Sequence, residues 1–232
     1  MSTMGSAVIH NNRISFIEKA LNKQGSVLAI RHWEPASFYE IDLHLPGVKM
    51  HQWQTPPHIK CRVAPYHYRD YTPARWNADT STCTLFIDAA HQGTGSLWAS
   101  QLRPGDVFNY IGIDGSHQHV KQDAHLVMLG DQSAIGHFNA LQQLASSYSW
   151  ISGMVILPET THRKHFVQAF PELPLETIAS PETLLAQLEA LPLHASWQYY
   201  LAGNSHLVEA LRKLLKARGC ASAQIQAQGF WK

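Results

Sequence analysis

Three side chains near the end of one candidate strand could bind a phosphorylated aromatic ligand. Arg69 offers a planar fork of N–H donors that suits a phosphate, and Tyr71, two residues further along an extended chain, presents a flat ring on the same side. Thr72 adds a hydroxyl group for a polar edge or chain. Together they suit a ligand with phosphate, polyol and aromatic parts, as in a flavin nucleotide. An ordinary turn with a surface arginine explains so short a pattern equally well.

A run of small residues then precedes a short candidate helix that extends to about residue 100. The run consists of Gly93, Thr94, Gly95 and Ser96. Small side chains leave backbone N–H groups open at a helix start, and such groups bind pyrophosphate readily. A plain glycine-rich turn before a helix is the equal alternative.

Two more small-residue turns follow candidate strands in the second half of the chain. These turns contain Asp131, Ser133 and Ala134, and then Gly203 and Asn204. Both would lie at the carboxyl edge of a parallel sheet, where such sheets bind ligands. The first turn is not GxGxxG, so it is not an ordinary Rossmann fingerprint. Two turns at the same sheet edge predict a pocket more strongly than either does alone.

The composition describes a globular protein and excludes several classes of function. Of 232 residues, 45% are hydrophobic and 15% charged, and the formal net charge of +1 does not suggest a nucleic-acid binder. Three scattered cysteines without a CxxC pair argue against an iron–sulfur cluster or a structural zinc site. So few thiols suit a reducing compartment, and we expect a cytoplasmic protein. Residues 1–14 do not resemble a signal peptide, and no apolar run is long enough to span a bilayer.

The first half of the chain is typical of a small antiparallel barrel. A short helix is predicted at residues 12–21, where three apolar residues share one face. The candidate strands are residues 26–33, 38–45, 58–63, 82–88 and 106–113. Proline, glycine and aspartate separate these strands at near-regular intervals, as in small barrels.

The second half alternates strands and helices. The candidate strands are residues 124–130, 153–157, 175–178, 197–202 and 224–230, and the candidate helices are residues 133–145, 162–170, 181–191 and 206–218. This alternation predicts a parallel sheet with helices on both faces. The polar segment at residues 117–122 is the natural boundary, so we expect a helical extension at 1–22, a barrel domain at 23–117 and an α/β domain at 118–232.

The ordered set of motifs resembles the siderophore-interacting proteins, which are FAD-binding ferric-siderophore reductases of the ferredoxin-reductase superfamily. The motifs are Pro57-His58-Ile59-Lys60, Arg69-Asp70-Tyr71-Thr72, Gly93 to Ala99, Arg103-Pro104-Gly105-Asp106, Gly130 to Ala134, Leu201-Ala202-Gly203-Asn204 and Gly229-Phe230-Trp231. Each motif is weak alone, but their order and spacing from about residue 26 to the C-terminus are specific. The resemblance implies an antiparallel six-stranded flavin-binding barrel followed by a parallel-sheet nucleotide-binding domain.

The resemblance also assigns roles to the candidate residues. Arg69, Tyr71 and Thr72 would hold FAD, residues 93–96 would bind its pyrophosphate, and Trp231 would cover or approach the flavin. The turns at Asp131, Ser133, Ala134, Gly203 and Asn204 would line a pocket for the nicotinamide nucleotide. Electrons would then pass from NADPH or NADH through FAD to a ferric siderophore, which releases Fe(II) in the cytoplasm.

Three cationic side chains are the candidates for attracting the anionic chelate: His58, Lys60 and Arg75. No acid–base residue is required for electron transfer, so no catalytic side chain is predicted. No protein ligand to a metal is predicted either, because the iron arrives chelated.

Several departures from the family pattern leave the electron donor open. Asn204 stands where the family often has an acidic residue, and Ser133 and Gly136 stand in a segment that often contains threonine and proline. One extra residue separates Thr72 from Arg75. Ferredoxin as the electron partner, and a flavin-binding or siderophore-binding protein without turnover, are therefore the alternatives. The oligomeric state and the particular siderophore are not predicted.

Overall fold

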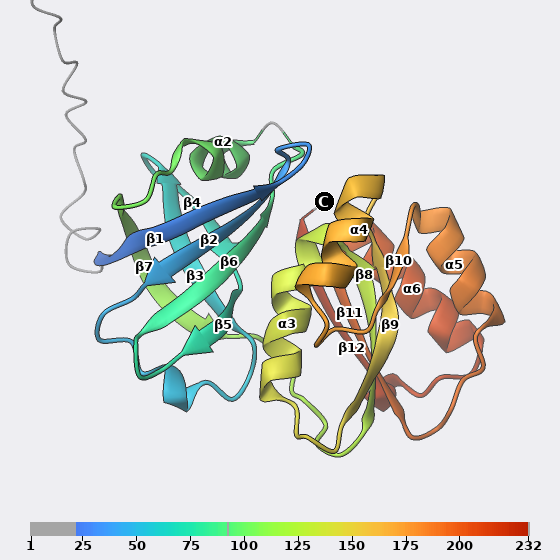
Figure 1. The fold of residues 1–232 in the computed structure, drawn as a ribbon. Helices are drawn as coiled ribbons and strands as arrows, with labels where there is room; N and C mark the ends of the chain where they lie inside the picture. Colours follow the sequence, from blue (N-terminus) through green and yellow to red (C-terminus); the bar gives the residue numbers. More distant parts are fainter. Residues whose placement is uncertain (1–21, 92, 232) are drawn as a thin grey trace, which may run out of the picture.

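The structure, a computed structural model, describes residues 22–91 and 93–231, which form two β-sheets side by side (Figure 1). The first sheet is antiparallel and has the order β4-β3-β7-β1-β2-β6-β5. Its strands are β1 (Lys23–Trp33), β2 (Phe38–His44), β3 (Pro57–Ala64), β4 (His67–Tyr71), β5 (Pro73–Asn77), β6 (Thr82–Asp88) and β7 (Val107–Gly115). A short 3-10 helix, η1 (Met50–Gln52), follows β2. Helix α2 (Thr94–Gln101) comes between β6 and β7 in the sequence and packs against this sheet.

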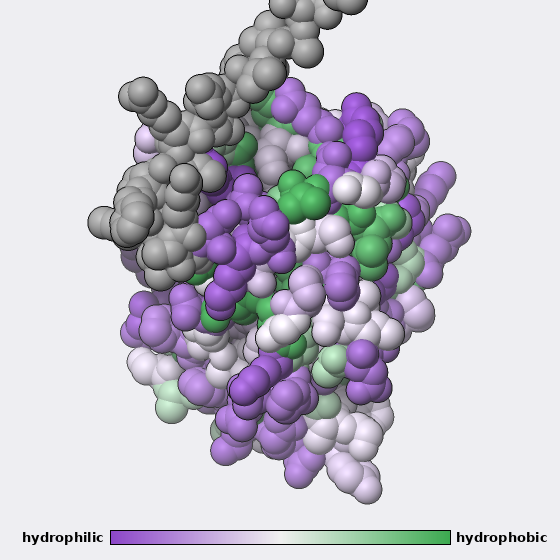
Figure 2. All heavy atoms as spheres, turned by 90° about the vertical axis from the view of Figure 1, so that its left-hand side faces the viewer, coloured by the Kyte–Doolittle hydropathy of each residue, from purple (hydrophilic) through white to green (hydrophobic). Residues whose placement is uncertain are grey.

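The inner face of this sheet forms one of three hydrophobic cores. In β3 the side chains of Ile59, Cys61 and Val63 are buried and alternate with the half-buried side chains of polar residues. Such alternation is what a strand with one buried face requires. The outer surface is mixed, with hydrophobic side chains scattered among hydrophilic ones (Figure 2). Leu28, Leu97 and Val107 are among the large apolar residues that are exposed.

The predicted fold class is confirmed, but the first sheet has seven strands instead of six. Strand β6 begins and ends as predicted, whereas β4 and β5 were not predicted as strands. Both are only five residues long, and β4 has no buried residue, so no alternating pattern marks it. Arg69, Asp70 and Tyr71 are the last three residues of β4, so they lie at a strand end, as expected, although the strand itself was not predicted.

The second sheet is parallel, with the order β10-β9-β8-β11-β12. Its strands are β8 (His125–Asp131), β9 (Trp150–Ile156), β10 (Glu176–Ile178), β11 (Trp197–Asn204) and β12 (Ile225–Trp231). The helices are α3 (Ile135–Leu144), α4 (Thr160–Ala169), α5 (Pro181–Ala190) and α6 (Ser205–Ala217), with 3-10 helices η2 (Gln132–Ala134) and η3 (Ser222–Gln224). Because the order reverses between β8 and β11, the carboxyl ends of these two strands form the edge where such sheets bind ligands.

Helices cover both faces of the second sheet, as predicted. Phe138 of α3 and Phe166 of α4 belong to the core on one face, and Leu184 of α5 and Leu211 of α6 belong to the core on the other. The first of these cores also contains Trp33 of the first sheet, so apolar packing is continuous from one sheet to the other.

The connection between the sheets runs from β7 to β8 and includes the predicted boundary at residues 117–118. Gln118 in this connection donates hydrogen bonds to the carbonyl oxygens of Leu201, at 3.1 Å, and Gln226, at 3.0 Å. The connection is therefore anchored to β11 and β12. The helix predicted at residues 12–21 lies outside the described residues. Within the described part of the chain, no helix is long and apolar enough to cross a membrane.

Candidate functional site

A cavity of about 660 Å³ opens between the two sheets. One wall consists of residues from β3, β4, the end of β6 and the start of α2, and the other consists of residues from the start of α3 and the end of β12. Of the predicted site residues, those that line it are His58, Arg69, Tyr71, Thr72, Gly93, Gly95, Ser96, Ser133 and Trp231. The structure thus brings together most residues of the predicted flavin site, which are separated by up to 173 positions in the sequence.

Tyr71 forms a fixed aromatic part of the first wall. Its ring stacks on Trp98 of α2, with 5.7 Å between ring centroids and 14° between ring planes. Burial raises the pKa of the Tyr71 hydroxyl, so this group stays protonated. A Cβ atom at Gly95 would lie 2.6 Å from the Tyr71 hydroxyl oxygen, which is closer than real Cβ atoms approach. The close packing of β4 against α2 therefore requires glycine at position 95.

The start of α2 lies beside this tyrosine. Gly93 has an extended backbone and precedes the first turn of the helix. Gly93, Gly95 and Ser96 line the cavity, while the Thr94 hydroxyl is buried and has no hydrogen-bond partner among the described residues. Small residues at a helix start and an arginine on the adjacent strand fit the pyrophosphate of FAD, and a stacked tyrosine fits its ring. The residues present thus suit the cofactor that the sequence motifs implied.

Asp131 at the end of β8 joins the two strands at the switch point of the second sheet. Its carboxylate accepts hydrogen bonds from the Ser133 N–H at 2.9 Å, the Ser133 hydroxyl at 2.5 Å and the Asn204 N–H at 2.7 Å. Burial raises the pKa of the Asp131 carboxyl despite these donors. Gly203 has a φ of +119°, and a Cβ there would lie 2.6 Å from the carboxylate, so glycine is required beside Asp131.

The other residues of the two turns serve the fold in this structure. The Asn204 side-chain oxygen accepts hydrogen bonds from the N–H groups of His206, at 3.0 Å, and Leu207, at 3.2 Å, and so caps α6. Ala134 is fully buried in the core. Of the five residues predicted for the nicotinamide pocket, only Ser133 lines the cavity. A nucleotide-binding role for the other four stays a prediction.

Trp231 reaches the cavity from the end of β12. Its indole N–H donates a hydrogen bond to the Ser133 hydroxyl oxygen at 3.1 Å, and its ring lies 4.5 Å from that of His91. These contacts hold the last aromatic side chain between the start of α3 and the segment after β6. Trp231 thus lines the cavity, and its role in covering the flavin stays a prediction.

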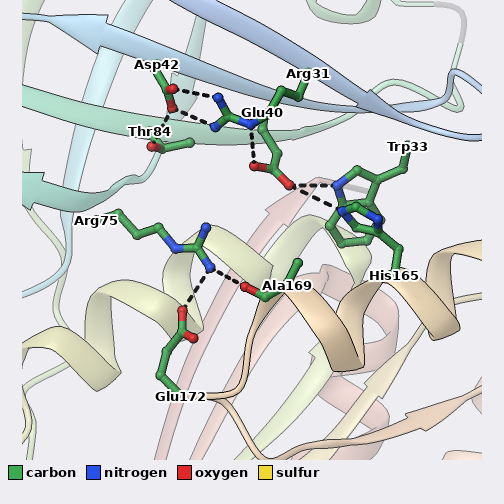
Figure 3. A network of polar contacts seen from close by, with 9 residues as sticks. All are labelled: Arg31, Trp33, Glu40, Asp42, Arg75, Thr84, His165, Ala169 and Glu172. Atoms are coloured by element: carbon green, nitrogen blue, oxygen red, sulfur yellow. Dashed lines mark hydrogen bonds and ion pairs between the residues drawn. The ribbon is translucent and has the colours of Figure 1, made fainter.

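The three cationic candidates have different surroundings. His58 lines the cavity, and Lys60 is paired with Asp70 at 3.0 Å on the exposed side of β3 and β4. Arg75 does not line the cavity and instead joins the first sheet to the segment after α4 (Figure 3).

The Arg75 guanidinium is occupied by contacts between the sheets. Its Nη2 donates hydrogen bonds to the carbonyl oxygen of Ala169, at 2.7 Å, and to the carboxylate of Glu172, at 2.9 Å. Its carbon Cζ lies 4.4 Å from the centre of the Phe170 ring. The expectation that Arg75 attracts the substrate therefore does not fit its position, because a partner carboxylate and an aromatic ring surround the charge.

Sequence reasoning missed several polar residues that line the cavity, and the most deeply buried of them are Asp88 and His137. Asp88 ends β6 with only 5% of its side chain exposed, and His137 lies on the buried face of α3. A polar residue on the apolar face of the predicted helix at 133–145 was the available signal for His137. Within residues 22–91 and 93–231, no three histidine, cysteine or acidic side chains are grouped so as to hold a metal ion.

Comparison with known proteins agrees with the fold. The family model for "Siderophore-interacting protein" matches residues 123–232. The siderophore-interacting protein from Acinetobacter baumannii has a TM-score of 0.74 and 16% identity, with 90% of each chain covered. SipS from Aeromonas hydrophila has a TM-score of 0.73 and 17% identity, covering 90% of this chain and 91% of its own. No curated protein matches the sequence.

A solved ferredoxin reductase also shares the fold. The ferredoxin reductase of carbazole 1,9a-dioxygenase has a TM-score of 0.71 and 15% identity, covering 91% of this chain and 67% of its own. At such identities the likeness establishes the fold alone. Residues 123–232 thus match the model of the siderophore-interacting protein family, within a chain that has the ferredoxin-reductase-like fold of solved siderophore-interacting proteins.

Proposed function

We propose that this protein is a flavin-dependent reductase that passes electrons from NADPH or NADH through FAD to a ferric siderophore. The observation that carries the proposal is the cavity wall in which Arg69 and Tyr71 of β4, with Thr72 directly after it, face the small-residue start of α2. Residues 23–117 would hold FAD, and residues 118–232 would receive the nicotinamide nucleotide. The two sheets meet at the cavity, so donor and cofactor would come together there.

The chain's own residues would bind and orient the cofactor. Arg69 would pair with a phosphate, and the N–H groups at the start of α2 would bind the pyrophosphate. The Tyr71 ring, held by Trp98, would support one face of the isoalloxazine ring, and Trp231 would close the side nearest the second sheet. The chemistry that FAD would supply here is the conversion of a two-electron hydride donor into single electrons, which Fe(III) requires.

The iron would be substrate rather than a resident metal. Fe(III) is a hard ion that oxygen ligands of a siderophore hold tightly, and one-electron reduction to the softer Fe(II) loosens the complex. His58 in the cavity wall and Lys60 beside it would attract an anionic chelate. Three free cysteines suit a reducing compartment, so we place the reaction in the cytoplasm.

One observation favours ferredoxin as an alternative electron donor. Asp131 and Asn204 were both predicted for the nicotinamide pocket, but their polar groups are already bonded within the protein. The Asp131 carboxylate accepts from the N–H groups of Ser133 and Asn204, and the Asn204 side-chain oxygen accepts from the His206 N–H. A protein donor would not need these groups to bind a nucleotide.

The test is a visible absorption spectrum of the protein with FAD, recorded anaerobically before and after addition of NADPH or NADH and then of a ferric hydroxamate chelate. We expect the flavin bands to bleach with a nicotinamide and to return with the chelate. Bound flavin that bleaches only with reduced ferredoxin would identify the alternative donor. Flavin that no donor reduces would indicate a binding protein without turnover, and failure to bind FAD would overturn the proposal.

A further inference from the structure

His137 is a buried histidine in the wall of the cavity. It lies in the first turn of α3, only 2% of it is exposed, and its ring packs edge-on against Phe230 at 5.5 Å between ring centroids. Its Nε2 lies 2.8 Å from the side-chain oxygen of Gln118. The position of the proton on this ring follows from what Gln118 binds.

The amide of Gln118 fixes the tautomer of His137. The amide nitrogen donates to two backbone carbonyls, those of Leu201 and Gln226, so the amide oxygen must face His137 and can only accept. Nε2 of His137 therefore carries the hydrogen. Burial, with a smaller contribution from His58, lowers the pKa of His137 to about 3, so the ring is neutral at physiological pH. In a neutral ring with a proton on Nε2, Nδ1 has a free lone pair.

This lone pair has no partner among the residues that the structure describes. Among residues 22–91 and 93–231, the only hydrogen bond of the His137 ring is the one from Nε2 to Gln118. The ring nevertheless belongs to the wall of the cavity. An uncharged acceptor in the wall of a cavity selects a ligand that brings an N–H or O–H donor.

We propose that His137 Nδ1 accepts a hydrogen bond from the N3–H group of the flavin ring, an inference that rests on the proposed function. A neutral acceptor cannot pair with the phosphates, which are acceptors themselves. Phe230 beside it offers an apolar surface suited to a flat ring rather than to a polyol chain. The oxidised isoalloxazine carries a single N–H, at N3, so that group is the donor which the site would select. His137 is then a cofactor-binding residue.

Two substitutions separate this role from a structural one. The amide of asparagine can place its oxygen near the position of Nδ1, whereas glutamine reaches the position of Nε2 and keeps the contact with Gln118. We expect His137→Asn to bind FAD within about threefold of the wild-type protein and His137→Gln to bind about tenfold more weakly, as measured by titration calorimetry. Circular dichroism of the FAD-free variants checks that both are folded.

A change on the ligand completes the test. FAD methylated at N3 lacks the donor, so it should bind the wild-type protein about tenfold more weakly than FAD does, while His137→Gln should scarcely distinguish the two. If His137→Gln binds FAD like the wild type and His137→Asn does not, the histidine only supports Gln118 and the inference is wrong. Equal losses on methylation in both proteins would overturn it as well. If the wild-type protein does not bind FAD at all, the proposed function fails first.

Discussion

Gly95 lies in the cavity wall, where even a methyl side chain would collide with a proposed flavin-binding residue. A methyl group there would lie 2.6 Å from the Tyr71 hydroxyl, and Tyr71 is held from behind by its stacking on Trp98. The ring would have to tilt out of the plane that we propose supports the flavin.

We therefore expect Gly95→Ala to weaken FAD binding by about five- to a hundredfold, the equivalent of roughly 1–3 kcal/mol of overpacking. Gly112→Ala is the matched control, because a Cβ there meets nothing within 4 Å and the residue lies outside the cavity wall. Calorimetric titration of both variants measures the difference. Equal affinities for the two would mean that Tyr71 moves without consequence for the ligand.

His137 also predicts how stability depends on pH. Its folded pKa of about 3 lies below the value of 6.5 for a free histidine, so the unfolded chain binds the extra proton between these two values. The stabilisation is present above pH 6.5 and is lost as the pH falls towards the folded pKa.

We expect the free energy of unfolding of the wild type to fall more steeply than that of His137→Gln below pH 6.5, by up to about 1.4 kcal/mol per pH unit. Urea unfolding at intervals from pH 7.5 to 4.5 measures the two curves. Parallel curves would show that His137 is protonated in the folded protein.

Helix α6 illustrates how an element can explain an unusual residue. Asn204 stands where the related family often has an acidic side chain, and in this structure it caps the helix by accepting two backbone hydrogen bonds. Its own N–H is bonded to the Asp131 carboxylate. The Asn204 amide therefore caps α6 without placing a second negative charge beside Asp131.

We expect Asn204→Ala to lower the free energy of unfolding by about 1 kcal/mol, whereas Asn204→Ser should stay within a few tenths of the wild type because serine is a good N-cap. Urea unfolding of the FAD-free proteins measures both. A serine variant as unstable as the alanine variant would show that the cap is not the source of the effect.

The strength of each element's sequence pattern decided which elements could be predicted. The alternation of β3 and the strong apolar face of α6 depend on single buried surfaces, and both were predicted. Strand β4 was missed because its residues are exposed or turned to the cavity, so no periodic pattern marks it. Arg69 and Tyr71 were found by their chemistry. His137 and the position of Arg75 depend on contacts between distant segments, which the sequence alone does not reveal.

Contacts between the sheets hold the two halves of the cavity in place. Glu172 accepts hydrogen bonds from Arg75 and, at 2.9 Å, from the Asn139 amide, and the backbone of Trp76 exchanges two hydrogen bonds with Gln143. On the neighbouring surface, Glu40 of the first sheet accepts a hydrogen bond from Trp33 and lies 3.7 Å from His165 of α4 (Figure 3). These contacts thus hold strands β2 and β5 of the first sheet against helices α3 and α4 of the second.

We expect a double-mutant cycle of Arg75→Ala and Glu172→Ala to give a coupling of about 1 kcal/mol in the free energy of unfolding, because the pair is about one-third exposed. The exposed pair of Lys213 and Glu209 on α6 is the control, with a smaller expected coupling because solvent screens the two charges. Equal couplings would mean that the contact between the sheets adds nothing beyond a surface ion pair. Urea unfolding of the four variants in each cycle provides the values.

The stacking of Trp98 on Tyr71, together with the position of Trp231 at the end of β12, has an optical consequence. Both indoles lie in or directly behind the cavity wall. Tryptophan emission overlaps the near-ultraviolet absorption of a flavin, so a bound isoalloxazine would quench the fluorescence of both indoles by energy transfer. Intrinsic tryptophan fluorescence would therefore report FAD binding without an added label. Trp98→Phe should reduce the quenching that FAD causes, while the other tryptophans still emit.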